Sequence, residues 1–134
     1  MHRGYIPIWR KLFDHPFWTE KRSFSRAEAW IDILSNTHYL DEPKRRLIKN
    51  QVVIQNYGEA IMSTRYCGER WGWHKTQVLR FFDTLRQMEQ IETKCDHNVN
   101  KIIVINFAIY DPKRIGIVTT LCPQLDHVVS KLKN

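Results

Sequence analysis

The sequence has no long apolar run and no apolar leader. Its longest aliphatic stretch is the four-residue run Ile102–Ile105, whereas a helix that spans a bilayer needs about 20 apolar residues. The first residues, Met1 to Tyr5, lack the apolar core of a signal peptide. We therefore expect a protein that has no membrane partner.

Cysteine is scarce as well. Cys67, Cys95 and Cys122 are odd in number, lie 28 and 27 residues apart, and form no Cys-x-x-Cys pair. This pattern is typical neither of a disulfide framework nor of a zinc ribbon. A reducing cytoplasm is the simplest compartment for such a chain.

Catalytic motifs are missing too. We identify no nucleophile motif, no phosphate-binding glycine loop and no pair of catalytic carboxylates. His38 with Asp41 and Glu42 resembles one corner of a metal site, but no second group of ligands completes it. The sequence therefore predicts a protein that is not an enzyme and that needs no cofactor and no metal.

The charge is positive but nearly evenly spread. The 134 residues hold 21 Lys and Arg against 14 Asp and Glu, which gives +7, with +3 on residues 1–60, +2 on 61–101 and +2 on 102–134. A basic chain permits an anionic partner such as nucleic acid. The even spread does not locate a site.

Two helices are predicted near the amino terminus. Ile6, Trp9 and Phe13 stand at helical spacing and predict a helix over residues 5–13, which Pro16 would end. A second helix over 26–39 is predicted from three inward residues, Trp30, Ile33 and Leu34. Ser25 and Glu28 have the spacing of a capping box at its start.

Short antiparallel strands are predicted over residues 44–62, where small apolar runs alternate with turn residues. Ser63 then fits the N-cap of a helix that runs to about Trp71, and Gly72 provides a sharp turn. A second helix follows over 75–88, with a buried stripe of Val78, Phe82 and Leu85.

Residues 91–105 predict a two-stranded hairpin with a polar tip over 96–100. Helix, glycine turn, helix and hairpin are the order of a winged helix-turn-helix. We therefore predict an α+β fold over 1–111: a winged helix-turn-helix with an extra amino-terminal helix pair and small β-hairpins. Residues 112–134 would form an extension with a short amphipathic helix after Pro123, built on Leu125, Val128, Val129 and Leu132.

This order of elements defines candidate DNA contacts, because the second helix of such a unit enters the major groove. The start and outer face of the 75–88 helix offer His74, Lys75, Thr76, Gln77, Arg80 and Thr84. The hairpin offers Lys94, Asn98 and Lys101, and the densest basic cluster, expected in a loop, offers Lys44, Arg45 and Arg46 beside Lys49. Asp83 on the same helix face opposes phosphate binding.

Each set has a structural alternative. A Thr, Gln and Arg face is what any solvated helix shows, and basic residues in hairpins and loops are often simply solvated. Aromatic side chains can stack on single-stranded nucleic acid. For the tryptophans, however, neighbours and spacing favour core or near-core roles; they are Trp9, Trp18, Trp30, Trp71 and Trp73.

The sequence resembles the amino-terminal winged-helix domain of phage and plasmid replication proteins, including the DnaD-like replisome organisers. The resemblance covers roughly residues 4–111. Its matching stretches are Gly4 to Leu12 with His15 to Trp18, Ala29 to Leu34, Gly58 with Ser63, Trp71 to Val78, and Asn106-Phe107 with Tyr110. Two positions depart from the pattern: His74 stands where the family has Ser or Thr, and Cys67-Gly68 stands where it has a leucine-alanine pair.

The resemblance implies a protein that binds double-stranded DNA during phage or mobile-element replication initiation. It also implies homodimers or larger homo-oligomers, contacts with the replicative helicase or other replisome proteins, and a place at the nucleoid of a bacterial or phage-infected cell. Two alternatives remain. One is a transcriptional regulator of the same fold, and the other is a protein-interaction scaffold with little affinity for DNA.

Overall fold

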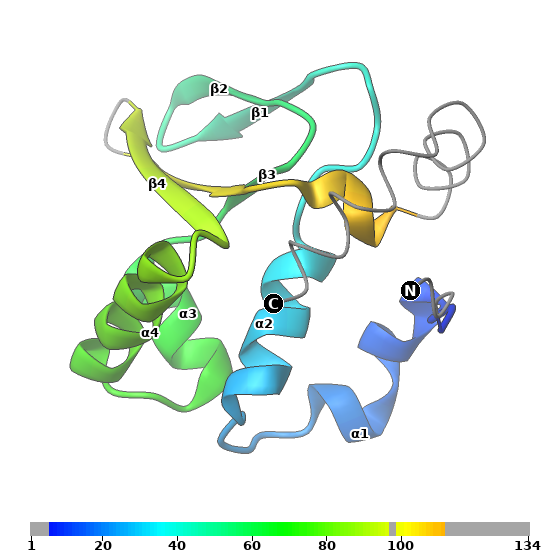
Figure 1. Cartoon of the computed structure of the whole chain (residues 1–134), viewed down its shortest axis with the longest axis vertical. Helices are drawn as coiled ribbons and strands as arrows, with labels where there is room; N and C mark the ends of the chain where they lie inside the picture. The colour runs from blue at the N-terminus through cyan, green and yellow to red at the C-terminus, as the bar shows by residue number, and fades with distance from the viewer. Residues whose placement is uncertain (1–5, 97–98, 112–134) are drawn as a thin grey trace.

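The computed structural model describes residues 6–96 and 99–111, which form a mixed α+β structure with small antiparallel sheets (Figure 1). In chain order the elements are η1 (Arg10–Asp14), α1 (Pro16–Thr19), α2 (Arg26–Ser35), β1 (Lys44–Ile48), β2 (Gln51–Gln55), β3 (Glu59–Ile61), α3 (Thr64–Trp71), α4 (Lys75–Gln87), β4 (Ile91–Asp96), β5 (Val99–Val104) and η2 (Phe107–Tyr110).

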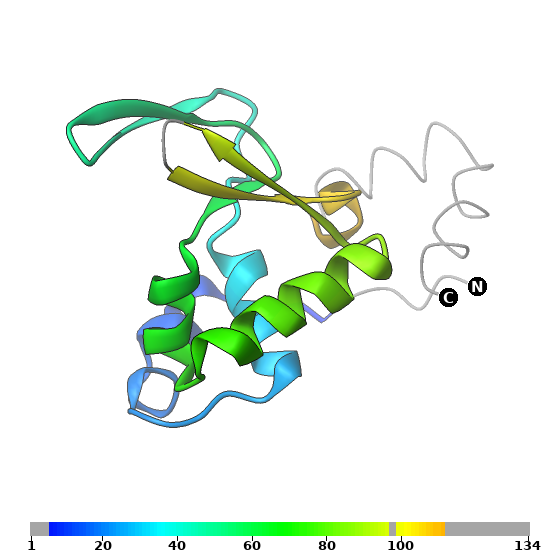
Figure 2. The same cartoon turned by 90° about the vertical axis from the view of Figure 1, so that its left-hand side faces the viewer.

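The strands form two separate antiparallel sheets. In the three-stranded sheet β5 is central and pairs with β3 on one side and β4 on the other. The hairpin β1–β2 forms the second sheet, and it lies on the opposite side of the three-stranded sheet from α2, α3 and α4 (Figures 1 and 2). The three-stranded sheet is thus the middle layer. Because successive residues of a strand point to opposite faces, alternate residues of each of its strands face the helices and the hairpin β1–β2.

The predicted helix starts are confirmed at the level of individual hydrogen bonds. The Glu28 N–H donates to Ser25 Oγ (3.1 Å) and the Ser25 N–H donates to Glu28 Oε1 (3.0 Å), which completes the capping box of α2. Ser63 Oγ likewise accepts from the Tyr66 N–H at the start of α3 (3.0 Å). Local sequence therefore fixes where both helices begin.

The turn between α3 and α4 depends on two glycines. Gly72 has φ +68°, a left-handed conformation that costs other residues about 1–2 kcal/mol. A Cβ at Gly68 would lie 3.0 Å from the Trp73 carbonyl oxygen. The departure at Gly68 thus has a packing reason, because α3 closely approaches the backbone of the turn that precedes α4 there.

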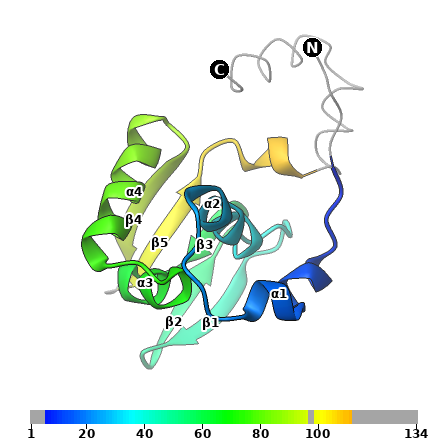
Figure 3. The same cartoon turned by 90° about the horizontal axis from the view of Figure 1, so that it is seen from below.

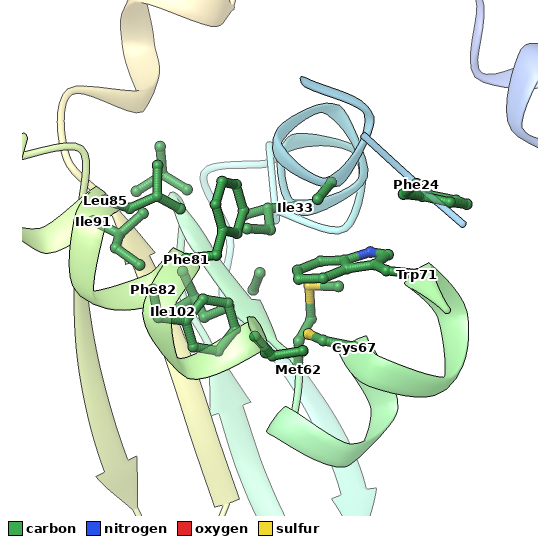
Figure 4. Close-up of a cluster of buried hydrophobic side chains, with 14 of the residues drawn as sticks. Phe24, Ile33, Met62, Cys67, Trp71, Phe81, Phe82, Leu85, Ile91 and Ile102 are labelled. Carbon is green, nitrogen blue, oxygen red and sulfur yellow. The ribbon is translucent and has the colours of Figure 1, made fainter. Parts of the chain in front are cut away.

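The core lies between the helices and the three-stranded sheet (Figure 4). Trp71 of α3 is fully buried, with its ring 5.9 Å from that of Phe81 and 6.2 Å from that of Phe82. The predicted stripe of α4 is confirmed, since Val78, Phe82 and Leu85 are buried, and Phe81 joins it.

The first of the two predicted amino-terminal helices is wrong. Residues 6–9 are irregular and are followed by the 3-10 turn η1 and the four-residue α1, so no helix spans 5–13 within the described part of the chain. Pro7 lacks an N–H and disfavours helix at the residue before it. Ile6 and Trp9 are 87% and 82% exposed, so the helical spacing of these apolar residues does not reflect a buried face.

The second predicted helix is four residues too long, since α2 ends at Ser35. Polar side chains close its last turn: Ser35 Oγ and Asn36 Nδ2 each donate to the Asp32 carbonyl (both 2.8 Å), and Thr37 Oγ1 donates to the Ile33 carbonyl (2.7 Å). These bonds satisfy carbonyls that further helical turns would otherwise use.

Candidate nucleic-acid interface

Helix α4 presents one polar face to solvent along its whole length. Its buried residues occupy one side, and at about 100° per residue the opposite side falls on Thr76, Arg80, Asp83 and Gln87, all of which are exposed. Gln77 and Thr84 flank this face, Thr84 being half-buried with its hydroxyl bonded to the Arg80 carbonyl (3.0 Å). Figure 2 shows α4 crossing the front of the molecule below β4 and β5.

The amino terminus of α4 is capped and carries positive charge. The Thr76 N–H donates to His74 Nδ1 at 3.2 Å, so histidine performs the capping role that Ser or Thr has at many helix starts. Lys75 is exposed in the first turn, and the helix dipole adds partial positive charge there. This end of the helix is therefore suited to an anion.

The negative charge of Asp83 is partly offset by its neighbours. Arg86 Nη2 lies 3.4 Å from Asp83 Oδ1, and Gln87 Nε2 lies 3.4 Å from Asp83 Oδ2. Arg86 also donates through Nη1 to Thr93 Oγ1 on β4 (3.0 Å), which ties the helix to the strand beside it. Lys75, Arg80 and Arg86 against Asp83 leave this surface of α4 with a net charge of +2.

A groove of about 370 Å³ separates α4 from the β4–β5 hairpin. Leu79 and Arg86 form its helix side, and Thr93, Lys94 and Cys95 its strand side. The sequence reasoning did not select Leu79, which is 45% exposed, or Arg86. The helical wheel could have identified them together, because residues seven apart lie on the same side of a helix, here beside the buried stripe.

The candidate DNA contacts of the β4–β5 hairpin differ in their exposure to solvent. Lys94 is exposed on β4. The expectation of an exposed Lys101 is wrong: this lysine is 5% exposed and its Nζ lies 3.6 Å from Glu59 Oε1. It points away from the face that holds Ile102, toward the layer that hairpin β1–β2 covers, so its ammonium is not presented to a phosphate. Asn98 lies outside the described residues.

The basic cluster is not in a loop, as predicted, but on strand β1. Lys44, Arg45 and Arg46 are all exposed, and strand alternation places Arg45 on one face of the hairpin and the other two on the opposite face. The turn of this hairpin lies on the same side of the molecule as the far ends of β4 and β5 (Figures 1 and 2). The expectation of a loop did not reveal that Arg45 lies on the opposite face from Lys44 and Arg46, because only in a strand do neighbouring residues point to opposite faces.

The tryptophans follow the packing interpretation with one exception. Trp71 and Trp73 are buried, and Trp18 and Trp30 pack against the core at its edge. Trp9 is the exception, since it is exposed in the irregular segment that precedes η1. Cys67 is completely buried, and burial raises the pKa of its thiol to about 12.

The metal-like corner at His38 is occupied by a backbone contact. His38 Nε2 lies 2.7 Å from the Glu42 carbonyl oxygen. Among residues 6–96 and 99–111, no group of three or more His, Cys, Asp or Glu side chains is arranged to hold a metal ion. No helix within the same ranges has the length and apolar character needed to cross a membrane.

Comparison of the chain with protein-family models, with curated proteins and with solved structures finds no match.

Proposed function

We propose that this chain is a winged helix-turn-helix protein that binds double-stranded DNA and acts in phage or mobile-element replication initiation. Three features support the fold assignment: α3 and α4 are joined by a tight glycine turn, β3-β5-β4 form an antiparallel sheet, and β4 follows α4 directly. The replication role is supported by the sequence resemblance.

The observation that carries the proposal is the exposed polar face of α4. In its amino-terminal half this face exposes Thr76, Gln77 and Arg80, whose side chains can form hydrogen bonds to base edges. Arginine recognises guanine and glutamine recognises adenine through paired hydrogen bonds in the major groove. A helix of this kind fits a groove about 12 Å wide.

The proposed mechanism divides recognition from positioning. Residues of α4 read base edges, while Lys75 at the helix start and Lys94 on β4 fix the protein on phosphates. Lys44 and Arg46 on hairpin β1–β2 would add phosphate contacts on a duplex that extends beyond the base pairs contacted by α4. Lys101 has no place in this mechanism, because its charge is already paired with Glu59. A two-fold homodimer would suit a palindromic site.

Substitution of Arg80 by alanine tests the role of α4. Affinity for a specific duplex should fall by about 1–3 kcal/mol while the fold is retained. Lys11→Ala is the matched control, because it also removes one exposed positive charge but lies on η1, which Figure 3 places away from α4 beside α1. Equal losses in both variants would show that general charge, rather than the α4 face, governs binding.

The hairpin β1–β2 favours a second candidate, a protein-interaction scaffold with little DNA affinity. Its outer face carries three exposed apolar residues: Leu47 at 74%, Val52 at 63% and Ile54 at 45%. Helicase contacts or self-association through this surface would serve the same replication process. The scaffold role predicts that Leu47→Asp reduces self-association or helicase binding and that no duplex is bound at low salt. A transcriptional regulator would use the same α4 face as the replication protein.

A further inference from the structure

An apolar groove lies on the opposite side of α2 from α4, and the proposed function does not use it. Its volume is about 400 Å³. Ile8 and Phe13 of the amino-terminal segment form one wall, Ile31 and Leu34 of α2 form the floor, and Ile109 and Tyr110 of η2 form the other wall. Ile8 is 53% exposed and Tyr110 is 40% exposed, so the groove leaves apolar surface open to solvent.

The walls of this groove are held in place. Arg10 Nη1 donates to the Ser35 carbonyl at 2.7 Å, and its guanidinium lies 4.3 Å from the centre of the Tyr39 ring. On the other side, the Tyr110 ring packs edge-on against Trp30 at 6.1 Å. Arg10 and Tyr110, both of which line the groove, are therefore held against residues of α2 or of the segment that follows it.

The described chain leaves the fold at the rim of this groove. Tyr57 Oη donates to Asp111 Oδ2 at 3.1 Å, directly after Tyr110, so the exit point is fixed. Leu125 is 14 residues beyond Asp111, which allows a reach of about 46–50 Å. The carboxy-terminal segment can therefore return to any part of the groove.

The sequence of that segment carries an apolar stripe. Leu125, Val128, Val129 and Leu132 follow the i, i+3, i+4, i+7 pattern of an amphipathic helix. A helix of about ten residues is not stable alone in water and gains its stability by packing its apolar face. An apolar groove next to the exit point provides the required surface within the same molecule.

We infer that residues 123–132 dock as a helix into the groove between the amino-terminal segment, α2 and η2 of the same chain. Docking buries the apolar stripe against Ile8, Ile31 and Leu34. It leaves α4 exposed, because the amino-terminal segment and η2, which line the groove together with α2, lie on the other side of α2 from α4 (Figure 3). The carboxy-terminal segment thereby completes the core on the side away from the proposed DNA interface.

Hydrogen exchange of the full chain, read by mass spectrometry on a peptide that covers 123–134, tests this inference. The wild type should exchange at least about tenfold more slowly there than an unstructured peptide, independently of protein concentration. Val128→Asp on the stripe and Ile8→Asp on the groove wall should each remove this protection. Ser130→Asp, off the stripe, should leave it unchanged.

Three results would overturn the inference. The wild-type peptide could exchange at the unstructured rate, or its protection could survive both Val128→Asp and Ile8→Asp. Protection that appears only as the chain dimerises would assign the groove to the segment of a second copy. Ile8 is exposed and outside the core, so its substitution keeps the test valid even if Val128→Asp impairs expression.

Discussion

Arg70 and Asp32 form a bidentate ion pair that joins α3 to α2. Arg70 Nε donates to Asp32 Oδ2 at 2.9 Å and Nη2 donates to Oδ1 at 2.6 Å, while Trp71 Nε1 also donates to Oδ2 at 2.8 Å. The Asp32 side chain is fully buried and that of Arg70 is 35% exposed. A buried carboxylate that accepts hydrogen bonds from Arg70 and Trp71 therefore positions the helix that leads into the α3–α4 turn.

Replacing Asp32 by alanine should therefore be costly. The Arg70 guanidinium and the Trp71 indole N–H would both lose their acceptor in a packed site, and we expect a loss of about 3 kcal/mol in the free energy of unfolding. Urea unfolding measures the change. Glu69→Ala is the control, since its ion pair with Arg65 is highly exposed and should contribute about 0.5 kcal/mol or less. A small effect at Asp32 would mean that α3 is positioned by apolar packing alone.

Substitution of Gly72 should disturb the same turn through the backbone. Alanine at φ +68° is strained, and its Cβ would lie 3.0 Å from the Arg22 carbonyl oxygen. We expect Gly72→Ala to lower the midpoint of thermal unfolding, with a stability loss of about 2 kcal/mol. Gly72→Asn should lose less, because asparagine adopts the left-handed conformation more readily. An alanine variant as stable as the wild type would contradict the tight packing of this turn.

Two described cysteines should differ in reactivity. Burial raises the pKa of the Cys67 thiol to about 12, so almost none of it is thiolate at about pH 8, and its side chain is inaccessible. Cys95 is exposed on β4. Under native conditions iodoacetamide should modify Cys95 rapidly and Cys67 only after unfolding, which peptide mapping would resolve. Rapid modification of Cys67 in the folded protein would show that α3 does not pack as described.

Glu28 should make stability depend on pH in the acid range. The hydrogen bond from the Ser25 backbone N–H lowers the pKa of this carboxyl below 4.5, and burial opposes this effect. The hydrogen bond and the positive charge of Arg22 lower the pKa further. A lowered folded-state pKa adds stability above the unfolded-state pKa, and this stability is lost as pH falls through the folded-state pKa. Glu28→Gln should flatten the decline of unfolding free energy between about pH 5 and pH 3. A Glu28→Gln variant whose stability declines as steeply as that of the wild type would contradict this contribution.

Sequence reasoning succeeded where a single local interaction decides the structure. Ser25, Ser63 and Gly72 act on their own helix ends, and the α4 stripe follows from one periodicity. It failed where distant segments meet. Nothing next to Lys101 in the sequence shows that Glu59 and a hairpin layer bury it, and nothing near Asp32 indicates Arg70, which lies 38 residues away. The spacing of Ile6 and Trp9 was misleading because periodicity does not show whether a surface exists to cover them.

The most direct measurement of the central claim is the affinity of the full chain for duplex DNA as a function of salt concentration. Binding through α4, with phosphate contacts from Lys75, Lys94, Lys44 and Arg46, predicts a slope of about −3.6 in a plot of log affinity against log salt. The Arg80→Ala variant should bind more weakly at every salt concentration, and Lys11→Ala should resemble the wild type. Absence of duplex binding at low salt, together with concentration-dependent oligomers, would contradict the DNA-binding function and support the scaffold.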